Sequence, residues 1–153
     1  MITISPIEAQ DFDALYAIEQ AAHAVPWSLG TLKNNQGERY LNLKIGEENK
    51  IYGFAICQTV LDEATLFNIA IDPQKQGLGL GRQLLNELIT QLRQKDILTL
   101  WLEVRESNKK PKRFMIRWAL IKWISVKTIT LPLMANGKMP WSWPPIYKVI
   151  FSS

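Results

Sequence analysis

The chain has 153 residues, 47% of them apolar, which is enough to bury the core of one domain. Its single cysteine, Cys57, excludes an internal disulfide and a multi-cysteine zinc site. The stretch Met1–Asp13 lacks the basic region and apolar run of a secretory signal. Lys122 and Lys127 interrupt the most apolar part of the C-terminal region, so no transmembrane helix is expected. These features predict a cytoplasmic protein that keeps its cysteine reduced.

The formal net charge of +4 conceals a division of charge at residue 108. Residues 1–108 contain nine Lys or Arg and all fourteen Asp and Glu, whereas residues 109–153 contain nine basic residues and no acidic one. Acids occupy about one position in eight of an ordinary globular sequence, so chance does not explain their absence from so long a stretch. The same stretch holds four of the six Trp and five of the eight Pro. We therefore expect a globular core over 1–108 and an atypical basic tail over 109–153.

The N-terminal part of the core predicts one strand and two helices. Alternation indicates a short strand at Ile2–Ser5. Asp11 can cap the helix that follows, and Pro26 can end it. The apolar residues of this helix fall on one face: Phe12, Leu15, Ile18 and Ala22. Ser28 can cap a short second helix.

The remainder of the core predicts a hairpin, a central strand, a helix and a further strand. Tyr40–Ile45 and Ile51–Leu61 flank a polar turn, as in a hairpin. The most continuously apolar run, Ala64–Ile71, is typical of a central strand, and Thr99–Val104 of the strand that follows the helix. The buried side of that helix should consist of Leu84, Leu85, Leu88, Ile89 and Leu92. This order predicts an α/β or α+β fold with a mixed sheet flanked by helices. The tail shows no clean period, and its prolines would interrupt any long element. Strands that close the sheet are therefore not expected there.

A glycine-rich segment lies between the central strand and the helix, with the sequence Gln76-Gly77-Leu78-Gly79-Leu80-Gly81. Glycines let an anion approach the unpaired N–H groups at the start of a helix, and Arg82 adds a cation beside them. A Walker loop is excluded, because Gly81 is followed by Arg82 rather than Lys. A dinucleotide fingerprint is excluded, because its last glycine would fall on Arg82 or Leu84.

The segment fits the pattern [QR]-x-x-G-x-[GA], and at this point the chain resembles the GNAT acetyltransferase family, which binds the pyrophosphate of acetyl-CoA with such a loop. Three further stretches look like the subgroup that acetylates the N-terminus of a small-subunit ribosomal protein: Val25–Ser28, Leu66–Pro73 and Leu100–Asn108. The resemblance covers residues 1–108 nearly continuously. It implies the GNAT fold, acetyl-CoA as co-substrate without a metal, and a protein N-terminal peptide as acceptor.

The resemblance also implies the residues of the cofactor site. In the family, two parallel strands splay apart, and the pantetheine arm pairs with the first of them like an added strand. Carried over to this chain, the pantetheine and acetyl end fall on Ile69, Ala70 and Ile71. The loop residues implied are Gln76, Gly77, Leu78, Gly79, Leu80, Gly81 and Arg82, and Asn108 corresponds to a residue that hydrogen-bonds the cofactor.

Glu103 is the candidate catalytic residue. Strand alternation places it with Trp101, on the face opposite Leu100. An α-amine attacks a thioester only when it is neutral, and a carboxylate can remove its proton, which as general-base catalysis contributes about 10²- to 10⁴-fold. We expect His23 to have a surface or capping role. Acidic residues such as Glu19 either favour a basic peptide or belong to solvated segments.

The family pattern fails after Asn108. There the family continues A-x-x-x-Y-x-x-x-G-F, whose Tyr protonates the departing thiolate, but this chain has Pro111, Met115, Ala119 and Leu120 at the four defined positions. Either the tail is divergent or the reading frame changes. Reading each codon one base earlier gives Ala or Thr, Tyr or His, and Gly at the first three positions and permits Phe at the fourth. We therefore hypothesise a frame change between Asn108 and Pro111, which also explains the missing acids and the excess of Trp and Pro.

Three functions remain open at this stage. The first is acetylation of a protein α-amine, most simply that of a ribosomal protein, by a monomer that binds no nucleic acid. The second is acetylation of a small-molecule amine by the same fold. In the third, the chain is inactive, or its basic tail with interleaved Trp binds ribosomal or other RNA. Steeply salt-dependent RNA binding that is lost on truncation after Asn108 would favour this third function.

The frame hypothesis predicts the nucleotide sequence of the gene. Genomic DNA sequenced across codons 105–115 should contain one inserted or deleted base relative to an open frame that encodes Tyr, Gly and Phe at the positions of Met115, Ala119 and Leu120. An uninterrupted frame that encodes residues 109–153 as they stand would contradict it.

Overall fold

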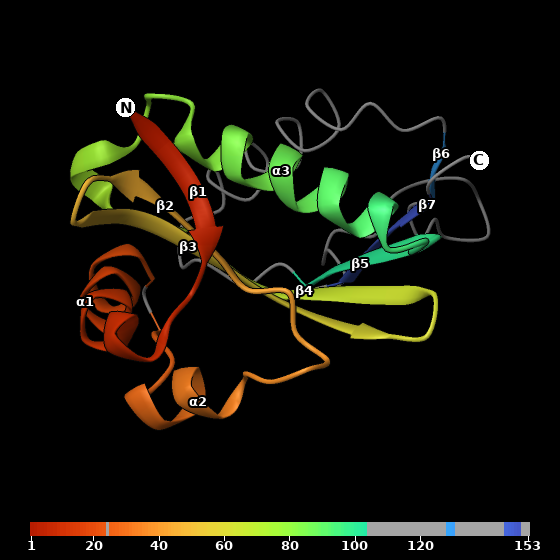
Figure 1. Cartoon of the computed structure of the whole chain (residues 1–153), viewed down its shortest axis with the longest axis horizontal. Coiled ribbons are helices and arrows are strands. Elements are labelled where there is room, and N and C mark those ends of the chain that lie inside the picture. Colours follow the sequence, from red (N-terminus) through yellow and green to blue (C-terminus); the bar gives the residue numbers. More distant parts are fainter. Residues whose placement is uncertain (24, 104–127, 131–145, 151–153) are drawn as a thin grey trace, which may run out of the picture.

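The computed structural model describes residues 1–23, 25–103, 128–130 and 146–150, with side chains described as far as residue 101. These residues form a seven-stranded sheet in the order β1-β2-β3-β4-β5-β7-β6 (Figure 1). Neighbouring strands are antiparallel except for the central pair β4 and β5, which is parallel. The predicted mixed sheet with flanking helices is therefore confirmed.

The N-terminal elements differ from prediction in how one carboxylate is used. Strand β1 (Ile2–Pro6) is followed by a 3₁₀ turn, η1 (Ala9–Asp11), and by α1 (Phe12–Ala22). The side chain of Asp11 makes no capping bond to α1, which corrects the prediction. It instead accepts from the backbone N–H of Glu8 at 2.7 Å and forms an ion pair with Lys44 at 2.6 Å. Ser28 does cap α2 (Leu29–Asn34), because its Oγ accepts from the N–H of Thr31 at 3.1 Å.

The central elements follow the predicted order. Strands β2 (Leu43–Glu47), β3 (Lys50–Val60) and β4 (Glu63–Ile71) form an antiparallel meander. After a second 3₁₀ turn, η2 (Pro73–Lys75), come α3 (Leu80–Gln94) and β5 (Thr99–Glu103). None of the described helices is long and apolar enough to cross a membrane.

Two short strands lie in the tail, where strands that close the sheet were not expected. β7 (Ile146–Ile150) pairs with β5, and β6 (Thr128–Thr130) pairs with β7, both antiparallel. The prediction was wrong at these two stretches because a strand without a periodic pattern can still pair with an available sheet edge. The other predictions about the tail lie outside the described residues.

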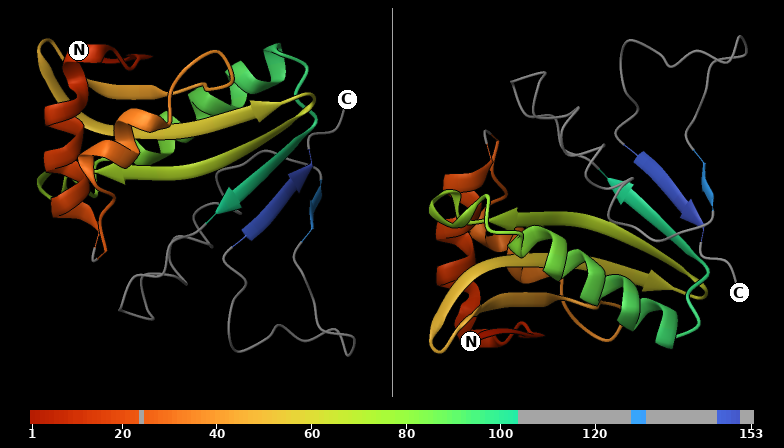
Figure 2. Two further views of the ribbon diagram at one scale, coloured as in Figure 1. Left: turned by 90° about the horizontal axis from the view of Figure 1, so that it is seen from below. Right: turned by 90° about the horizontal axis from the view of Figure 1, so that it is seen from above.

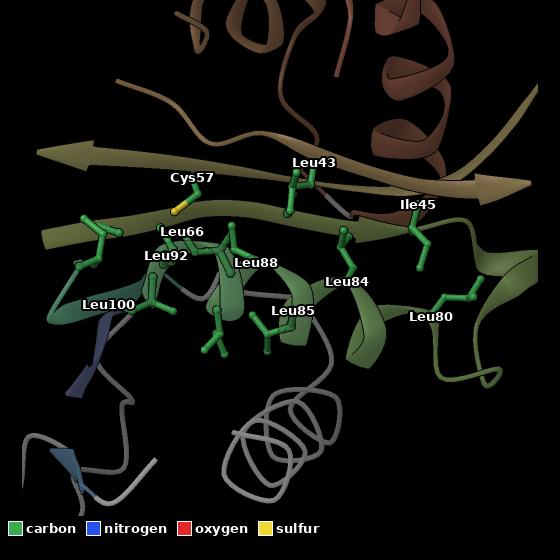
Figure 3. Packing of buried hydrophobic residues seen from close by; sticks show 14 residues of the cluster. Leu43, Ile45, Cys57, Leu66, Leu80, Leu84, Leu85, Leu88, Leu92 and Leu100 are labelled. Carbon is green, nitrogen blue, oxygen red and sulfur yellow. The ribbon is translucent and has the colours of Figure 1, made fainter. Parts of the chain in front are cut away.

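Helices cover both faces of the sheet and divide the core into two layers. Helix α3 lies on one face, and α1 and α2 lie on the other (Figure 2). On the α3 face, Leu84 and Leu88 point toward Leu43 and Cys57 of the sheet (Figure 3). The five predicted apolar residues of α3 are all buried, and Leu80 joins them. On the opposite face, Leu15 of α1 belongs to the second cluster, together with residues of β3 and β4.

A β-bulge at Phe67 divides β4 into two parts. Ile56 opposes Asn68 while the next residue, Cys57, opposes Leu66, so Phe67 has no partner in β3. An extra residue reverses the alternation of side chains and bends its strand. Before the bulge, Leu66 faces the α3 layer. After it, Asn68 and Ala70 turn to the α1 side, which positions the polar group discussed below.

The fold predicts how the single thiol responds to pH and to reagents. Cys57 is fully buried on the α3 face, and burial raises its pKa from 9.0 to about 12. The unfolded chain therefore loses the thiol proton first, so stability should fall as pH rises from 9.0 to about 12. Urea unfolding should show a smaller fall for Cys57→Ala over this range. Native protein should react with a thiol reagent only on unfolding, and rapid labelling without denaturant would contradict the burial.

Candidate functional site

The site is built on the edge of β4 that β5 leaves uncovered. β4 and β5 pair over four residues only, from Glu63 with Thr99 to Leu66 with Leu102. β4 then continues to Ile71, and within the described part of the chain no strand pairs with this edge after Leu66. The two strands start side by side and diverge (Figure 2). The divergence begins at the bulge, because a bulge bends its strand and increases the local twist.

The backbone groups that face this open edge follow from the pairing on the other side of β4. The N–H of Asp72 donates to the carbonyl of Tyr52 at 2.7 Å, so the backbone of Asp72 faces β3. Backbone groups alternate between the two edges along a strand. Ala70 therefore also faces β3, whereas Ile69 and Ile71 present N–H and C=O groups to the open edge. An extended ligand can pair with these groups as an added strand does.

The loop after β4 is tied to the end of that strand by its first residue. The side-chain amide of Gln76 donates to the carbonyl of Ile71 at 3.2 Å. Both residue types allowed at this position of the pattern, Gln and Arg, carry N–H donors that can make such a bond. The preceding turn is fixed by Asp72, whose Oδ1 accepts from the N–H of Gln74 at 3.0 Å.

Two glycines give the loop its conformation and leave space above it. Gly77 has φ +84° and Gly79 has φ +79°, in the left-handed region that disfavours side chains. A Cβ built on either residue meets no atom within 4 Å. Gly81 differs, because a Cβ there would lie 3.5 Å from the side chain of Ile71, an ordinary contact. The first two glycines are therefore needed for the turn and leave the approach to their amides open.

Helix α3 begins directly at this loop. Gly79 is its N-cap, and no side chain caps the first turn. The first bond of the helix runs from the N–H of Gln83 to the carbonyl of Gly79, so the N–H groups of the three preceding residues have no partner within the helix. Leu80 is 4% exposed and anchors the turn in the core, while Gln76–Gly79 and Arg82 are exposed. Exposed N–H groups at a helix start form a site for a negatively charged group.

The structure thus brings together two of the predicted groups: the strand residues Ile69–Ile71 and the loop residues Gln76–Arg82. Glu103 is the last residue of β5, one position beyond the last pair with β4, so its backbone lies where the strands diverge. Its side chain, Asn108 and position 115 lie outside the described residues. Across the described residues no group of three His, Cys, Asp or Glu is suited to hold a metal ion.

One polar cluster was not predicted from the sequence. Glu19 was expected to be solvated, but it is fully buried beneath Asn68. The amide nitrogen of Asn68 lies 2.9 Å from each carboxylate oxygen of Glu19. His23 is the C-cap residue of α1, which is one of the two roles expected for it. Its side chain has a further role, because its Nε2 lies 3.0 Å from the Asn68 oxygen and 3.2 Å from Glu19. Asn68 was the available signal, as the one residue with a side-chain amide inside the apolar run of β4.

A parallel strand pair that diverges around an open edge, with a glycine turn and a helix start beside it, is suited to an extended ligand that carries a negatively charged group. The acetyltransferase (GNAT) family matches residues 5–117, and this chain belongs to it.

Two proteins with high sequence identity to this chain carry the same name. A [ribosomal protein bS18]-alanine N-acetyltransferase from Haemophilus influenzae is 72% identical over 138 residues, covering 90% of this chain and 93% of that protein. The protein of the same name from Escherichia coli strain K12 is 58% identical over 108 residues, covering 71% of this chain and 73% of that one.

Solved structures share the fold. The crystal structure of the ribosomal-protein-S18-alanine N-acetyltransferase from Escherichia coli has a TM-score of 0.71 and 42% identity, covering all of this chain and 96% of that one. A PaiA N-acetyltransferase from Thermoplasma acidophilum, solved in complex with coenzyme A, has a TM-score of 0.71 at 16% identity, covering 99% of each chain. At this identity, the second comparison concerns the fold alone.

The loop geometry predicts that two glycines respond differently to the same substitution. Gly79→Ala places a Cβ in a left-handed residue, which costs about 1 to 2 kcal/mol, and projects it into the open space above the amides. We expect acetyl-CoA affinity, measured by calorimetry, to fall at least about tenfold, or about 1.4 kcal/mol.

Gly81→Ala is the matched control. Its Cβ makes an ordinary contact, and the family pattern accepts Ala at this position, so it should retain affinity within about twofold, or about 0.4 kcal/mol. Thermal unfolding of both variants without ligand separates binding from stability. Equal affinity of the two variants would argue against a phosphate site at this turn.

Proposed function

We propose that this chain transfers the acetyl group of acetyl-CoA to the N-terminal α-amine of ribosomal protein bS18, which begins with alanine. The observation that carries this proposal is the 72% identity to the Haemophilus influenzae enzyme of that activity over 90% of the chain. The open edge of β4 and the glycine turn support it independently, since both suit a CoA thioester. The acceptor is a ribosomal protein, so we expect the chain to act in the cytoplasm, as a monomer and without binding nucleic acid directly.

The cofactor would lie along the diverging strands. Its pantetheine arm, which carries amides, would pair with the backbone of Ile69 and Ile71, while Ala70 holds the strand in register with β3. The pyrophosphate would accept hydrogen bonds from the backbone N–H groups of the turn and of the first residues of α3, and Arg82 would lie beside it. Asn108 would add a hydrogen bond from the segment after β5. This placement puts the thioester near the bulge, where β4 and β5 separate.

The chemistry requires two protons to leave the α-ammonium, one before attack and one as the amide forms, and it requires one proton to reach the thiolate. Glu103, at the end of β5, would remove the first proton from the acceptor's α-ammonium, directly or through one water. The nitrogen then forms a bond to the carbonyl carbon, and the carbon–sulfur bond breaks. The family's Tyr, which would protonate the departing thiolate, has no counterpart at Met115. We therefore expect weak or no turnover by the chain as it stands.

The identities to the Escherichia coli protein support a division of the chain into a core, 1–108, and an atypical tail, 109–153. The sequence match, 58% over 108 residues, contains about 63 identical positions, and the match to the crystal structure, 42% over the whole chain, about 64. The identities to the Escherichia coli protein therefore fit within a stretch as long as the core, whereas the Haemophilus influenzae match of 138 residues includes at least thirty residues of the tail. The charge division at the same point supports a frame change before the tail.

The proposed function predicts the outcome of an acetylation assay. A peptide with the N-terminal sequence of bS18 is incubated with acetyl-CoA, and its gain of one acetyl group is followed by mass spectrometry. A chain in which the frame is restored after Asn108 should acetylate this peptide at least about 10² times faster than the chain as it stands. Free small-molecule amines serve as competing acceptors, and their preferential acetylation would overturn the choice of substrate.

The same assay tests Glu103. In the frame-restored chain, Glu103→Gln keeps the size of the side chain but removes the base, so the rate should fall by about 10² to 10⁴ while acetyl-CoA affinity is retained. Glu63→Gln, at the exposed start of β4, is a matched control and should leave the rate unchanged. An undiminished rate in Glu103→Gln would exclude this carboxylate as the base.

A further inference from the structure

The buried carboxylate of Glu19 is the centre of a cluster that neither the cofactor site nor the proposed chemistry uses. Glu19 lies near the C-terminal end of α1 and is fully buried. Its oxygens accept hydrogen bonds from the side-chain amide of Asn68 at 2.9 Å and from the backbone N–H of Trp27 at 3.3 Å. The Nε2 atom of His23 lies 3.2 Å from the same carboxylate. A buried carboxylate is costly unless donors converge on it, so the cluster is a fixed polar unit within an apolar layer.

The cluster fixes which ring nitrogen of His23 carries the proton. The nitrogen of the Asn68 amide donates to Glu19, so its oxygen faces His23 as an acceptor. Nε2 of His23 thus meets two acceptors, the oxygens of Asn68 and Glu19, and must be the N–H donor. In the neutral ring, Nδ1 then carries a lone pair. Among the described residues no group donates a hydrogen bond to it, and the His23 side chain is 23% exposed.

The cluster lies beside the position expected for the thioester. Asn68 is the first residue after the bulge and directly precedes Ile69, which begins the open edge of β4. The bulge turns Asn68 to the face of the sheet that α1 covers. Glu103 is the last residue of β5, and its backbone lies where the two strands separate. His23, through its contact with Asn68, lies beside the start of the open edge, on the side of the sheet away from α3.

An α-ammonium group matches this arrangement. It carries three N–H donors, of which one proton must be lost before attack and the others need acceptors that orient the nitrogen toward the carbonyl carbon. We propose that His23 binds the acceptor, with Nδ1 accepting a hydrogen bond from the N-terminal amine, and that Glu19 and Asn68 are positioning residues that hold the ring in this tautomer. This inference rests on the proposed function, and it adds the residue that distinguishes a free amine from a blocked one.

A conservative substitution separates this role from a structural one. In His23→Gln, the side-chain NH₂ can replace Nε2 as donor to Asn68 and Glu19. The carbonyl oxygen of Gln then points away from the position of Nδ1, so no acceptor remains at that position. The test is calorimetric binding of the bS18 N-terminal peptide, free or N-acetylated, to the full chain saturated with CoA. Wild type should bind the free peptide at least tenfold more tightly than the acetylated one, and His23→Gln should lose this preference while CoA affinity and thermal stability stay unchanged. Gln20→Ala, exposed on α1, is the control and should retain the preference.

A second measurement needs no substitution, because His23 is the only histidine of the chain. With histidine labelled with ¹⁵N, two-bond correlation spectra should show one ring protonated at Nε2, and its Nδ1 resonance should shift on adding the free peptide but not the acetylated one. An unmoved Nδ1 resonance, a wild type without preference for the free amine, or a His23→Gln variant that keeps the preference would each overturn the inference. Failure of the wild-type chain to bind CoA would instead count against the proposed function, so the two failures are distinguishable.

Discussion

The architecture depends on the point at which two parallel strands stop pairing. β4 and β5 share four residue pairs and then separate at Phe67, the residue that β3 leaves unpaired. The separation leaves a strand edge with N–H and C=O groups facing outward, which most proteins avoid because such an edge pairs with whatever chain approaches. In this fold the edge is short and is followed at once by the glycine turn. The same bulge that exposes the edge also turns Asn68 toward α1.

In the proposed mechanism, cofactor binding uses one edge of β4, and acceptor binding uses the face that α1 covers. The backbone N–H and C=O groups of Ile69 and Ile71 face the open edge of β4. Their side chains pack against the α3 layer, which keeps the strand rigid. The same layer holds the glycine turn in place, because Leu80 is buried in it. The turn is also fixed by the hydrogen bond from the side chain of Gln76 to the end of β4. The opposite face carries the buried Glu19, and the partners of its carboxylate include Asn68, His23 and the backbone of Trp27.

The strands of the tail lie on the other side of β5, at the edge that faces away from β4. Strand β7 pairs with the edge of β5 that faces away from β4, so residues of the C-terminal segment complete this side of the sheet. A strand edge accepts backbone partners with little regard for side chains, whereas general-acid chemistry requires one side chain at one position. A tail that supplies backbone pairing can thus complete a sheet without completing an active site. This difference separates membership of the family, which the core establishes, from the turnover that the full chain can support.

Sequence alone determined much of this protein. Residue periodicity located the helices and the central strand, because apolar side chains must recur at the spacing of the element that buries them. The glycine turn was recognisable because left-handed backbone and close approach both require glycine. Three features needed the tertiary structure: the bulge, the use of Asp11 by Lys44 rather than by α1, and the burial of Glu19 against Asn68. Each depends on contacts between residues far apart in the chain, and a local pattern carries no information about which partner folding will bring to a given side chain.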